Sequence, residues 1–414
     1  MSTTPARLEL AKDLAHHLRQ GHPWVFRNAL GHVPRLAPGE VVDVTSGGRF
    51  VARGLYDPLS PIAVRVFGLL ETEPLDAALF HRRMDQAAAL RRQVIDPTRT
   101  NAFRLVHGES DFLPGVVCDI YAGFAVLKLY SAALTPHREA LVDAIRAAWP
   151  GLHGVFGRDE VGREDDEERS TGERSRGVEA SSARDKRGRV LFGDAPPERI
   201  AIREEGSQLW VDVRVGQKTG LFLDQRENRL ALRRYVRGRD VLNCFAYTGG
   251  FSVNAALGGA KQVTSLDLDG DAIALARDNF TLNGVDPSPH DFMVGDVFKW
   301  LGQWKHSGRR FDAIVLDPPA FAKSQAKVAA ALGGYAALNR AALQILRPGG
   351  FLLTASCSAR VSPEDFGSAV AAAADKINVP LQLLEERGQP PDHPVSVRFP
   401  QGRYLKFFIY RRAD

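Results

Sequence analysis

Beyond residue 200 the sequence alternates short apolar runs with longer segments of helical periodicity. The apolar runs lie at 241–244, 262–267, 292–294, 313–317 and 351–356, with helical segments at 250–257, 270–282 and 327–346. This alternation predicts an α/β fold with a doubly wound, Rossmann-like parallel sheet, because a crossover between parallel strands takes a helix. Ligands of such sheets bind beyond the carboxyl ends of the strands. Functional residues are therefore expected just after each apolar run.

The residues before 160 show two other patterns. Up to about residue 70, short apolar runs such as Trp24–Phe26 and Val41–Val44 alternate with turns that contain glycine and proline. This pattern is typical of a small β domain. Helical segments at 75–93 and 137–148 then flank strand-like runs, which indicates a compact α+β domain.

Residues 162–189 carry eight acidic and eight basic side chains among 28 residues and no aromatic residue. They cannot bury enough apolar surface to offset the entropy lost on ordering. We therefore predict a mobile charged insertion or linker over 161–190. It separates a small β-barrel domain (1–72) and a central α+β domain (73–160) from the Rossmann-like domain (191–414). Its balanced charge argues against a basic RNA-binding arm.

Composition limits the class of protein. With 44% hydrophobic and 25% charged residues, the chain resembles ordinary soluble proteins. No apolar run approaches the roughly 20 residues that span a bilayer, and the N-terminus lacks the apolar core of a secretory signal, so we expect a cytoplasmic protein without membrane contact. The net charge of +5 is compatible with a nucleic-acid partner but does not require one. The three cysteines are too scattered to predict a disulfide framework or a metal site.

The segment 243–250 follows the first strand of the predicted sheet and opens a helix. Its paired glycines permit positive φ angles, and a helix N-terminus favours an anion such as the carboxylate of a methionine moiety. Asp267, 24 residues after Asn243, has the spacing at which an acidic side chain accepts hydrogen bonds from ribose hydroxyls. Asp296 is expected to end the third strand and to help fix an adenine.

Each of these features alone is more often a tight turn or a helix cap. Their occurrence in register on three successive strands favours a nucleoside-containing cofactor. A nicotinamide cofactor is disfavoured because the G-x-G-x-x-G fingerprint is absent.

Two further strand ends carry reactive or rigid groups. Asp317-Pro318-Pro319 follows the fourth strand, where the prolines would form a rigid rim for a planar base and Asp317 would contact its polar edge. Cys357 follows the fifth strand, where its thiolate could attack C6 of a cytosine and make C5 nucleophilic. A lone cysteine is more often a small buried hydrophobe, and we interpret Cys118 and Cys244 in that way. The position of Cys357 opposite Asp317 favours a nucleophile.

Over nearly its full length the chain resembles the PUA-containing, RlmI-type 23S ribosomal RNA 5-methylcytosine methyltransferases. The segments that carry this resemblance are 19–26, 108–115, 218–226, 243–250, 317–319, 356–358, 392–395 and 404–406. It departs from the family at Phe112, where glycine is frequent, at Ala320-Phe321 after the prolines, and in the charged insertion.

The resemblance implies a PUA domain that helps to hold RNA and a catalytic domain that uses S-adenosylmethionine. By it, Cys357 is the nucleophile, Asp317 orients the cytosine, and Gln225 and Arg226 approach the cofactor. The expected cofactor-binding residues are Gln225, Arg226, Asn243, Phe245, Tyr247, Thr248, Gly249, Gly250, Asp267, Asp296 and Asp317. The expected substrate-binding residues are Pro318, Pro319, Phe321, Arg19, Trp24 and Arg27, of which Trp24 would suit a core equally well.

The implied partner is 23S ribosomal RNA or an assembling large subunit, and the sequence does not decide between a monomer and a homodimer. Two other functions stay open. One is an RNA or protein N-methyltransferase that uses Asp317-Pro318-Pro319, although such enzymes usually have an aromatic residue directly after the prolines. The other is a non-catalytic RNA-binding or ribosome assembly factor.

Overall fold

The computed structural model describes residues 4–158, 188–321 and 325–414. The chain divides into two compact units. The first comprises Met1–Ile200, Val211–Leu221 and Pro391–Gly402, and the second comprises Ala201–Trp210, Phe222–Pro390 and Arg403–Asp414. This division does not test the domain boundaries predicted from the sequence, which stay a prediction.

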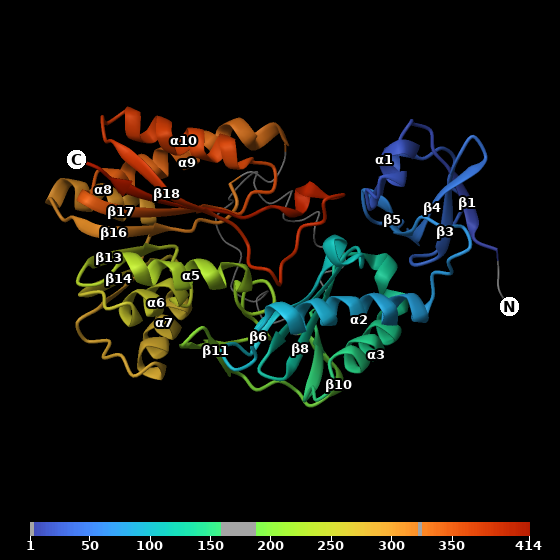
Figure 1. The fold of residues 1–414 in the computed structure, drawn as a ribbon, viewed down its shortest axis with the longest axis horizontal. Coiled ribbons are helices and arrows are strands. Elements are labelled where there is room, and N and C mark those ends of the chain that lie inside the picture. Colours follow the sequence, from blue (N-terminus) through green and yellow to red (C-terminus); the bar gives the residue numbers. More distant parts are fainter. Residues whose placement is uncertain (1–3, 159–187, 322–324) are drawn as a thin grey trace, which may run out of the picture. The chain divides into compact units, whose positions relative to one another are not determined.

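The N-terminal part of the first unit is built on a small β-sheet (Figure 1, blue). The sheet has the order β1-β3-β4-β5-β2. Its elements are β1 (Ala6–Glu9), α1 (Ala15–Arg19), β2 (Trp24–Phe26), β3 (Val41–Ser46), β4 (Arg49–Tyr56) and β5 (Ile62–Gly68). Alternate apolar side chains such as Leu8, Val42 and Val64 are fully buried and form one core. The predicted small β domain is therefore present.

A second sheet in the first unit has the order β10-β9-β8-β7-β6. The elements are α2 (Ala77–Val94), β6 (Ala102–His107), β7 (Val116–Tyr121), β8 (Phe124–Leu129), α3 (Arg138–Ala148), β9 (Gly154–Gly157) and β10 (Arg189–Gly193). Apolar residues of both helices and of this sheet share one core, as an α+β domain requires. Arg189 and Val190, the last two residues of the predicted linker, belong to β10 and pair with β9. The rest of it, apart from Gly188, lies outside the described residues.

The described part of the second unit contains a seven-stranded sheet of order β15-β14-β13-β16-β17-β19-β18. Its strands are β13 (Asp240–Cys244), β14 (Gln262–Asp267), β15 (Asp291–Val294), β16 (Phe311–Leu316), β17 (Leu346–Ser356), β18 (Leu381–Arg387) and β19 (Lys406–Arg412). The strands from β13 to β17 run parallel. The predicted doubly wound sheet is confirmed, but the antiparallel strands β18 and β19 were not predicted.

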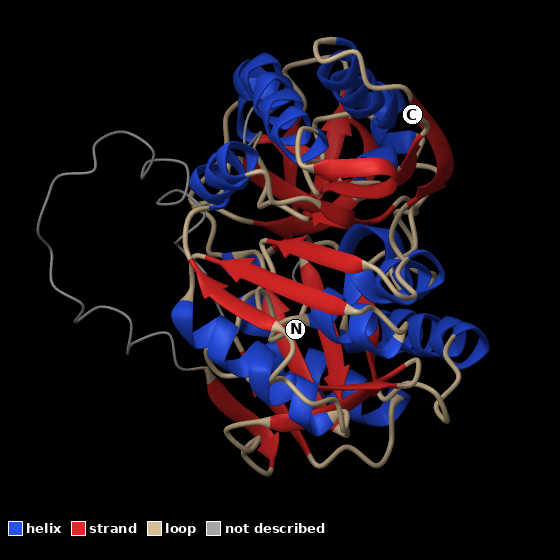
Figure 2. Cartoon of the chain, turned by 90° about the vertical axis from the view of Figure 1, so that its left-hand side faces the viewer, coloured by secondary structure: helices blue, strands red, loops and turns tan. Residues whose placement is uncertain are grey.

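Helices cover both faces of this sheet. They are α5 (Arg226–Leu232), α6 (Gly250–Leu257), α7 (Gly270–Leu282), α8 (Val297–Ser307), α9 (Val328–Leu343) and α10 (Pro363–Asp375). Figures 1 and 2 show the sheet between helical layers, with α6 and α7 on one face and α9 and α10 on the other. The strand order reverses between β13 and β16, which is the point where doubly wound sheets bind their ligands. The hairpin of β11 (Ile200–Glu204) and β12 (Ser207–Val211) precedes the sheet in the chain.

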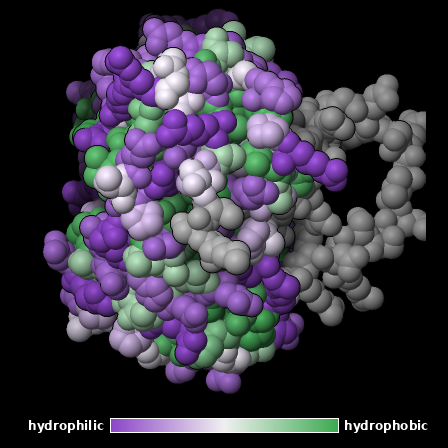
Figure 3. Space-filling model, turned by 90° about the vertical axis from the view of Figure 1, so that its right-hand side faces the viewer, coloured by the Kyte–Doolittle hydropathy of each residue, from purple (hydrophilic) through white to green (hydrophobic). Residues whose placement is uncertain are grey.

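The surface shown in Figure 3 mixes hydrophilic and hydrophobic residues instead of gathering either kind into one band. Within the described residues, no helix combines the length and the apolar character needed to cross a bilayer.

Candidate cofactor and catalytic site

Four strand ends of the second unit form the candidate site. Cys244 of β13 pairs with Leu266 of β14 and with Leu316 of β16, and Leu316 pairs with Thr354 of β17. Because these strands are parallel and adjacent, the segments that follow them leave the sheet at the same edge. The structure therefore brings the 245–250 loop, Asp267, Asp317 and Cys357 to one rim, as the sequence predicted.

The loop after β13 is a tight turn fixed by the neighbouring strand end. Phe245, Tyr247 and Gly249 have positive φ angles of 59°, 47° and 76°. The Tyr247 N–H donates to Asp267 Oδ2 at 2.7 Å, and the Asp269 N–H donates to Asp267 Oδ1 at 3.0 Å. Positive φ is costly for residues other than glycine and clusters at ligand-binding turns. Asp267 thus holds this loop in the shape that would face a bound nucleoside.

Gly249 is required by packing as well as by its backbone angle. A Cβ atom at this position would lie 2.7 Å from Cβ of Ala276 in α7. Gly249 also occupies the N-cap of α6, so a shift there would move the first turn of the helix.

Two buried polar atoms beside this loop have no hydrogen-bond partner within the part of the chain that the structure describes. They are Asn243 Oδ1 and Thr248 Oγ1, on side chains that are 1% and 5% exposed. Asn243 Nδ2 donates to Ser252 Oγ at 2.9 Å. Buried polar atoms are nearly always paired, so a polar ligand fits this position. The residues present therefore suit the amino-acid moiety of S-adenosylmethionine.

Gln225, one of the residues expected to approach the cofactor, forms a hydrogen bond with Asp317 of the Asp-Pro-Pro segment. Its Nε2 donates to Asp317 Oδ1 at 3.0 Å, while its Oε1 accepts from Asn228 Nδ2 at 2.7 Å. Gln225 is buried, and the second hydrogen bond fixes the orientation of its amide. Arg226, also buried, begins α5 directly after it. The structure therefore places Gln225 beside the Asp317 carboxylate.

Cys357 is the most accessible of the three cysteines. Cys118 and Cys244 are fully buried, whereas Cys357 is half-buried. Burial raises the pKa of the thiols of Cys118 and Cys244, which keeps them protonated and inert. The interpretation of these two as packing residues is confirmed. Cys357 Sγ lies 4.0 Å from the carbonyl oxygen of Pro318, so the thiol sits against the Asp-Pro-Pro rim.

The rim beyond Asp317 is partly buried. Pro318 is buried and Pro319 is exposed. The Phe321 ring packs against the Tyr335 ring of α9, with centroids 4.6 Å apart and an interplanar angle of 31°. This contact holds Phe321, which follows the Asp-Pro-Pro segment, against α9.

Asp296 lies two residues beyond the last residue of β15 and does not end that strand as predicted. It is exposed, and its carboxylate caps α8 by accepting from the Lys299 N–H at 2.9 Å. Asp296 therefore caps the beginning of the following helix instead of ending the strand. A role of Asp296 in binding adenine stays a prediction.

The predicted RNA-binding residues Arg19, Trp24 and Arg27 belong to the first unit. Arg19 is exposed. Trp24 Nε1 donates to Glu109 Oε1 at 2.8 Å, and the Trp24 ring lies 4.7 Å from that of Phe399. Arg27 donates to the hydroxyl of Tyr56 at 3.2 Å and to the carbonyl oxygen of Ser60 at 3.0 Å. Trp24 and Arg27 therefore have structural partners, and their contact with RNA stays a prediction.

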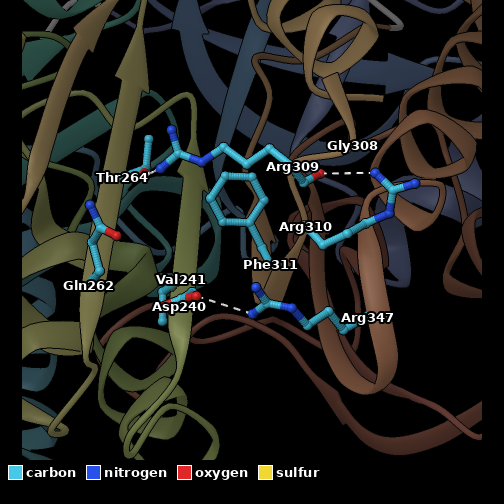
Figure 4. Close-up of a pocket in the computed structure, with 9 residues that line it drawn as sticks. All are labelled: Asp240, Val241, Gln262, Thr264, Gly308, Arg309, Arg310, Phe311 and Arg347. Carbon is cyan, nitrogen blue, oxygen red and sulfur yellow. Dashed lines mark hydrogen bonds and ion pairs between the residues drawn. The ribbon is translucent and has the colours of Figure 1, made fainter. Parts of the chain in front are cut away.

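A cavity of about 410 Å³ lies at the opposite, amino-terminal edge of the sheet (Figure 4). The first residues of β13, β14 and β16 line it together with Arg309, Arg310 and Arg347. Two of these arginines form ion pairs: Arg309 with Asp291 at 2.8 Å and Arg347 with Asp240 at 3.1 Å. The cavity is thus remote from the four strand ends and is not part of the candidate site.

Replacing Gly249 by alanine should weaken the binding of S-adenosylhomocysteine at least about tenfold, because the clash with Ala276 displaces the loop. Gly284→Ala is the matched control. Gly284 has a φ of 68°, but a Cβ there would meet nothing within 4 Å. The control should cost about 1–2 kcal/mol of stability through backbone strain alone and leave binding unchanged. Titration calorimetry and thermal unfolding separate the two effects, and equal binding by both variants would contradict the role of Gly249.

Two family models match the sequence. The model described as S-adenosylmethionine-dependent methyltransferase matches residues 179–407, and the model described as PUA-like domain matches residues 8–68. A Salmonella arizonae protein named ribosomal RNA large subunit methyltransferase I is 40% identical, and the match covers 98% of this chain and 97% of that protein. A protein of the same name from Escherichia coli O139:H28 is 39% identical, and the match covers 98% of this chain and 99% of that protein.

Solved structures give the same fold. A Streptococcus mutans structure described as a SAM-dependent methyltransferase is 26% identical and superposes with a TM-score of 0.82 over 98% of this chain and 100% of that chain. A methyltransferase in complex with S-adenosylhomocysteine has a TM-score of 0.81 at 24% identity over 99% of this chain and 100% of its own, which shows the fold alone. These matches confirm the predicted combination of a PUA-like and a Rossmann-like methyltransferase domain.

Proposed function

Because this chain belongs to the S-adenosylmethionine-dependent methyltransferase family that includes the ribosomal RNA large subunit methyltransferase I proteins, we propose that it methylates C5 of a cytosine in 23S ribosomal RNA. The relatives' name supports ribosomal RNA of the large subunit as the substrate. The observation that carries C5 chemistry is the half-buried thiol of Cys357, which lies 4.0 Å from the Pro318 carbonyl oxygen and follows β17, the strand next to the one that Asp317 follows.

The cofactor is S-adenosylmethionine, which supplies an electrophilic methyl group when bound. Asp267, the 243–250 loop and the buried polar atoms of Asn243 and Thr248 would hold it. Tight binding by the chain therefore depends on the loop shape that the Tyr247–Asp267 hydrogen bond maintains at 2.7 Å.

In the proposed reaction, Cys357 Sγ forms a bond to C6 of the cytosine. The C5–C6 π electrons shift to C5, which would take the methyl group of the bound cofactor and leave S-adenosylhomocysteine as the second product. After methylation a base removes the C5 proton, the C5–C6 double bond forms again, and the bond from C6 to Sγ breaks. Asp317, held by Gln225 at 3.0 Å, would contact the amino edge of the base throughout. The base must leave its stack to reach the thiol, so an unpaired RNA segment is the expected target.

The test uses the full chain with S-adenosylmethionine and large-subunit ribosomal RNA. With normal RNA, nucleoside digestion and mass spectrometry should yield 5-methylcytidine. With RNA that contains 5-fluorocytosine, which has no C5 proton to lose, a denaturing gel should show a protein–RNA adduct. If the methyl group is found on a nitrogen atom and no adduct forms, the proposal is contradicted and the N-methyltransferase hypothesis is favoured. If the protein does not bind S-adenosylmethionine, the hypothesis of a non-catalytic ribosome assembly factor is favoured.

A further inference from the structure

One tyrosine, Tyr335, contacts the residues on both sides of Cys357. Ser356 Oγ donates to the Tyr335 hydroxyl at 3.0 Å, and Ser358 Oγ lies 3.0 Å from the same hydroxyl. All three side chains are buried. Tyr335 also packs against Phe321 at the end of the Asp-Pro-Pro rim. It therefore links the turn that carries the thiol to the end of the Asp-Pro-Pro rim.

A buried lysine approaches the same turn from the neighbouring strand. Lys406 of β19 pairs in register with Ser356 of β17 and is only 1% exposed. Its Nζ donates to the Ser358 carbonyl oxygen at 2.6 Å and to the Tyr404 carbonyl oxygen at 2.9 Å. Burying an ammonium group costs several kcal/mol unless it is well paired. Neutral carbonyl groups satisfy its hydrogen bonds but do not balance its charge.

We propose that Lys406 is a positioning residue that stabilises the thiolate form of Cys357, while Tyr335 fixes the turn on which the thiol stands. The proposal rests on the proposed function, in which Cys357 is the nucleophile. The thiol loses its proton to solvent, and the Lys406 ammonium keeps its own proton and balances the new negative charge. No other reactant is needed for this step.

The charges around Lys406 agree with this role. Burial is the main cause that lowers the pKa of Lys406 to about 8; Cys357 acts against this shift, and the positive charge of Arg403 adds to it. Lys406 therefore carries its charge below about pH 8 and loses it as the pH rises through that value. Burial raises the pKa of Tyr335, so its hydroxyl stays protonated over the same range. Because Lys406 and Cys357 interact electrostatically, the Lys406 ammonium favours the thiolate form of Cys357.

The rate of alkylation by iodoacetamide measures the thiolate fraction of Cys357 directly, and the measurement requires neither RNA nor methyl transfer. Since Cys118 and Cys244 are fully buried, Cys357 is the thiol that should react in the folded protein. In the wild type, the rate should reach half its maximum below the ordinary thiol value of about pH 8.5. Lys406→Met should move that midpoint upward by about one pH unit and slow alkylation about tenfold at pH 7. Lys406→Arg keeps the charge and should stay near the wild-type profile.

Lys128→Met is the matched control, since Lys128 is a buried lysine (5% exposed) of the first unit. It should leave the profile of Cys357 unchanged. A purely structural role of Lys406 predicts that the methionine and arginine variants change alike in stability with no shift in the profile, and that result would overturn the proposal. Peptide mapping of Cys118 and Cys244 reports any unfolding of a variant. Should Lys406→Met unfold, a wild-type midpoint at or above about pH 8.5 still overturns the proposal.

This readout separates the inference from the proposed function. A shifted alkylation profile without any 5-fluorocytosine adduct would support the activated thiolate and reject cytosine C5 as its target. An adduct with an unshifted profile would support C5 methylation and reject the role of Lys406.

Discussion

Replacing Cys357 by alanine should abolish both methyl transfer to ribosomal RNA and the covalent adduct with 5-fluorocytosine RNA. Without a bond to C6, C5 of cytosine is too weak a nucleophile to accept a methyl group, so the rate should fall by about 10⁴-fold or more. Filter-bound label from S-adenosylmethionine measures the first effect, and denaturing gels measure the second.

The loss must be separated from misfolding. Cys357 is half-buried at the rim, so removal of its sulfur should change stability little, and titration calorimetry should show unchanged binding of S-adenosylhomocysteine. Cys118→Ala is the control, because that cysteine is fully buried in the first unit and should retain methyl transfer. Normal methylation of RNA by Cys357→Ala would exclude the thiol as nucleophile and favour methylation of a nitrogen.

The residues at the strand ends could be predicted from the sequence because each strand is marked by its own apolar run. An apolar run indicates which residues form a strand and about where the strand ends, and in a parallel sheet all carboxyl ends share one edge. The sequence pattern therefore predicts that Asp267, Asp317 and Cys357 share one rim, and this prediction does not depend on side-chain packing. The predicted position of Asp296 at the end of a strand is wrong, because the apolar run does not determine the last residue of β15, and Asp296 caps α8 instead.

The contacts behind the rim could not be predicted in this way. Strand β18 leaves Leu383 and Leu384 exposed, so it lacks the alternation of a half-buried strand. Without β18 and β19, nothing in the pattern brings Lys406 next to Cys357. A lysine inside the run Leu405–Tyr410 is a signal that sequence reasoning could have used, since lysine is almost never fully buried without a partner.

One departure from the resembling family has a backbone explanation. Phe112, where that family often has glycine, adopts a left-handed conformation with φ 60° and ψ 22° after a short 3-10 helix. Glycine adopts this conformation without steric cost, whereas phenylalanine does not. The difference therefore concerns local strain in the first unit and does not bear on the chemistry at the rim.

Replacing Asp317 by asparagine should reduce kcat for RNA methylation by about 10²–10³-fold. The substitution keeps the shape of the side chain but removes its charge, and with it the strongest acceptor for the cytosine amino group and for Gln225 Nε2. Single-turnover rates at saturating RNA measure this effect.

Asp312→Asn is the matched control, because it makes the same change at the other end of β16. Asp312 pairs there with Arg347 at 2.9 Å, away from the rim. Its loss should lower stability slightly and leave kcat unchanged. If Asp317→Asn and Asp312→Asn have equal rates, Asp317 has no role in the reaction beyond its place at the end of a strand. A fall in kcat for Asp317→Asn alone, with the 5-fluorocytosine adduct formed slowly, would mean that the carboxylate orients the base before Cys357 attacks.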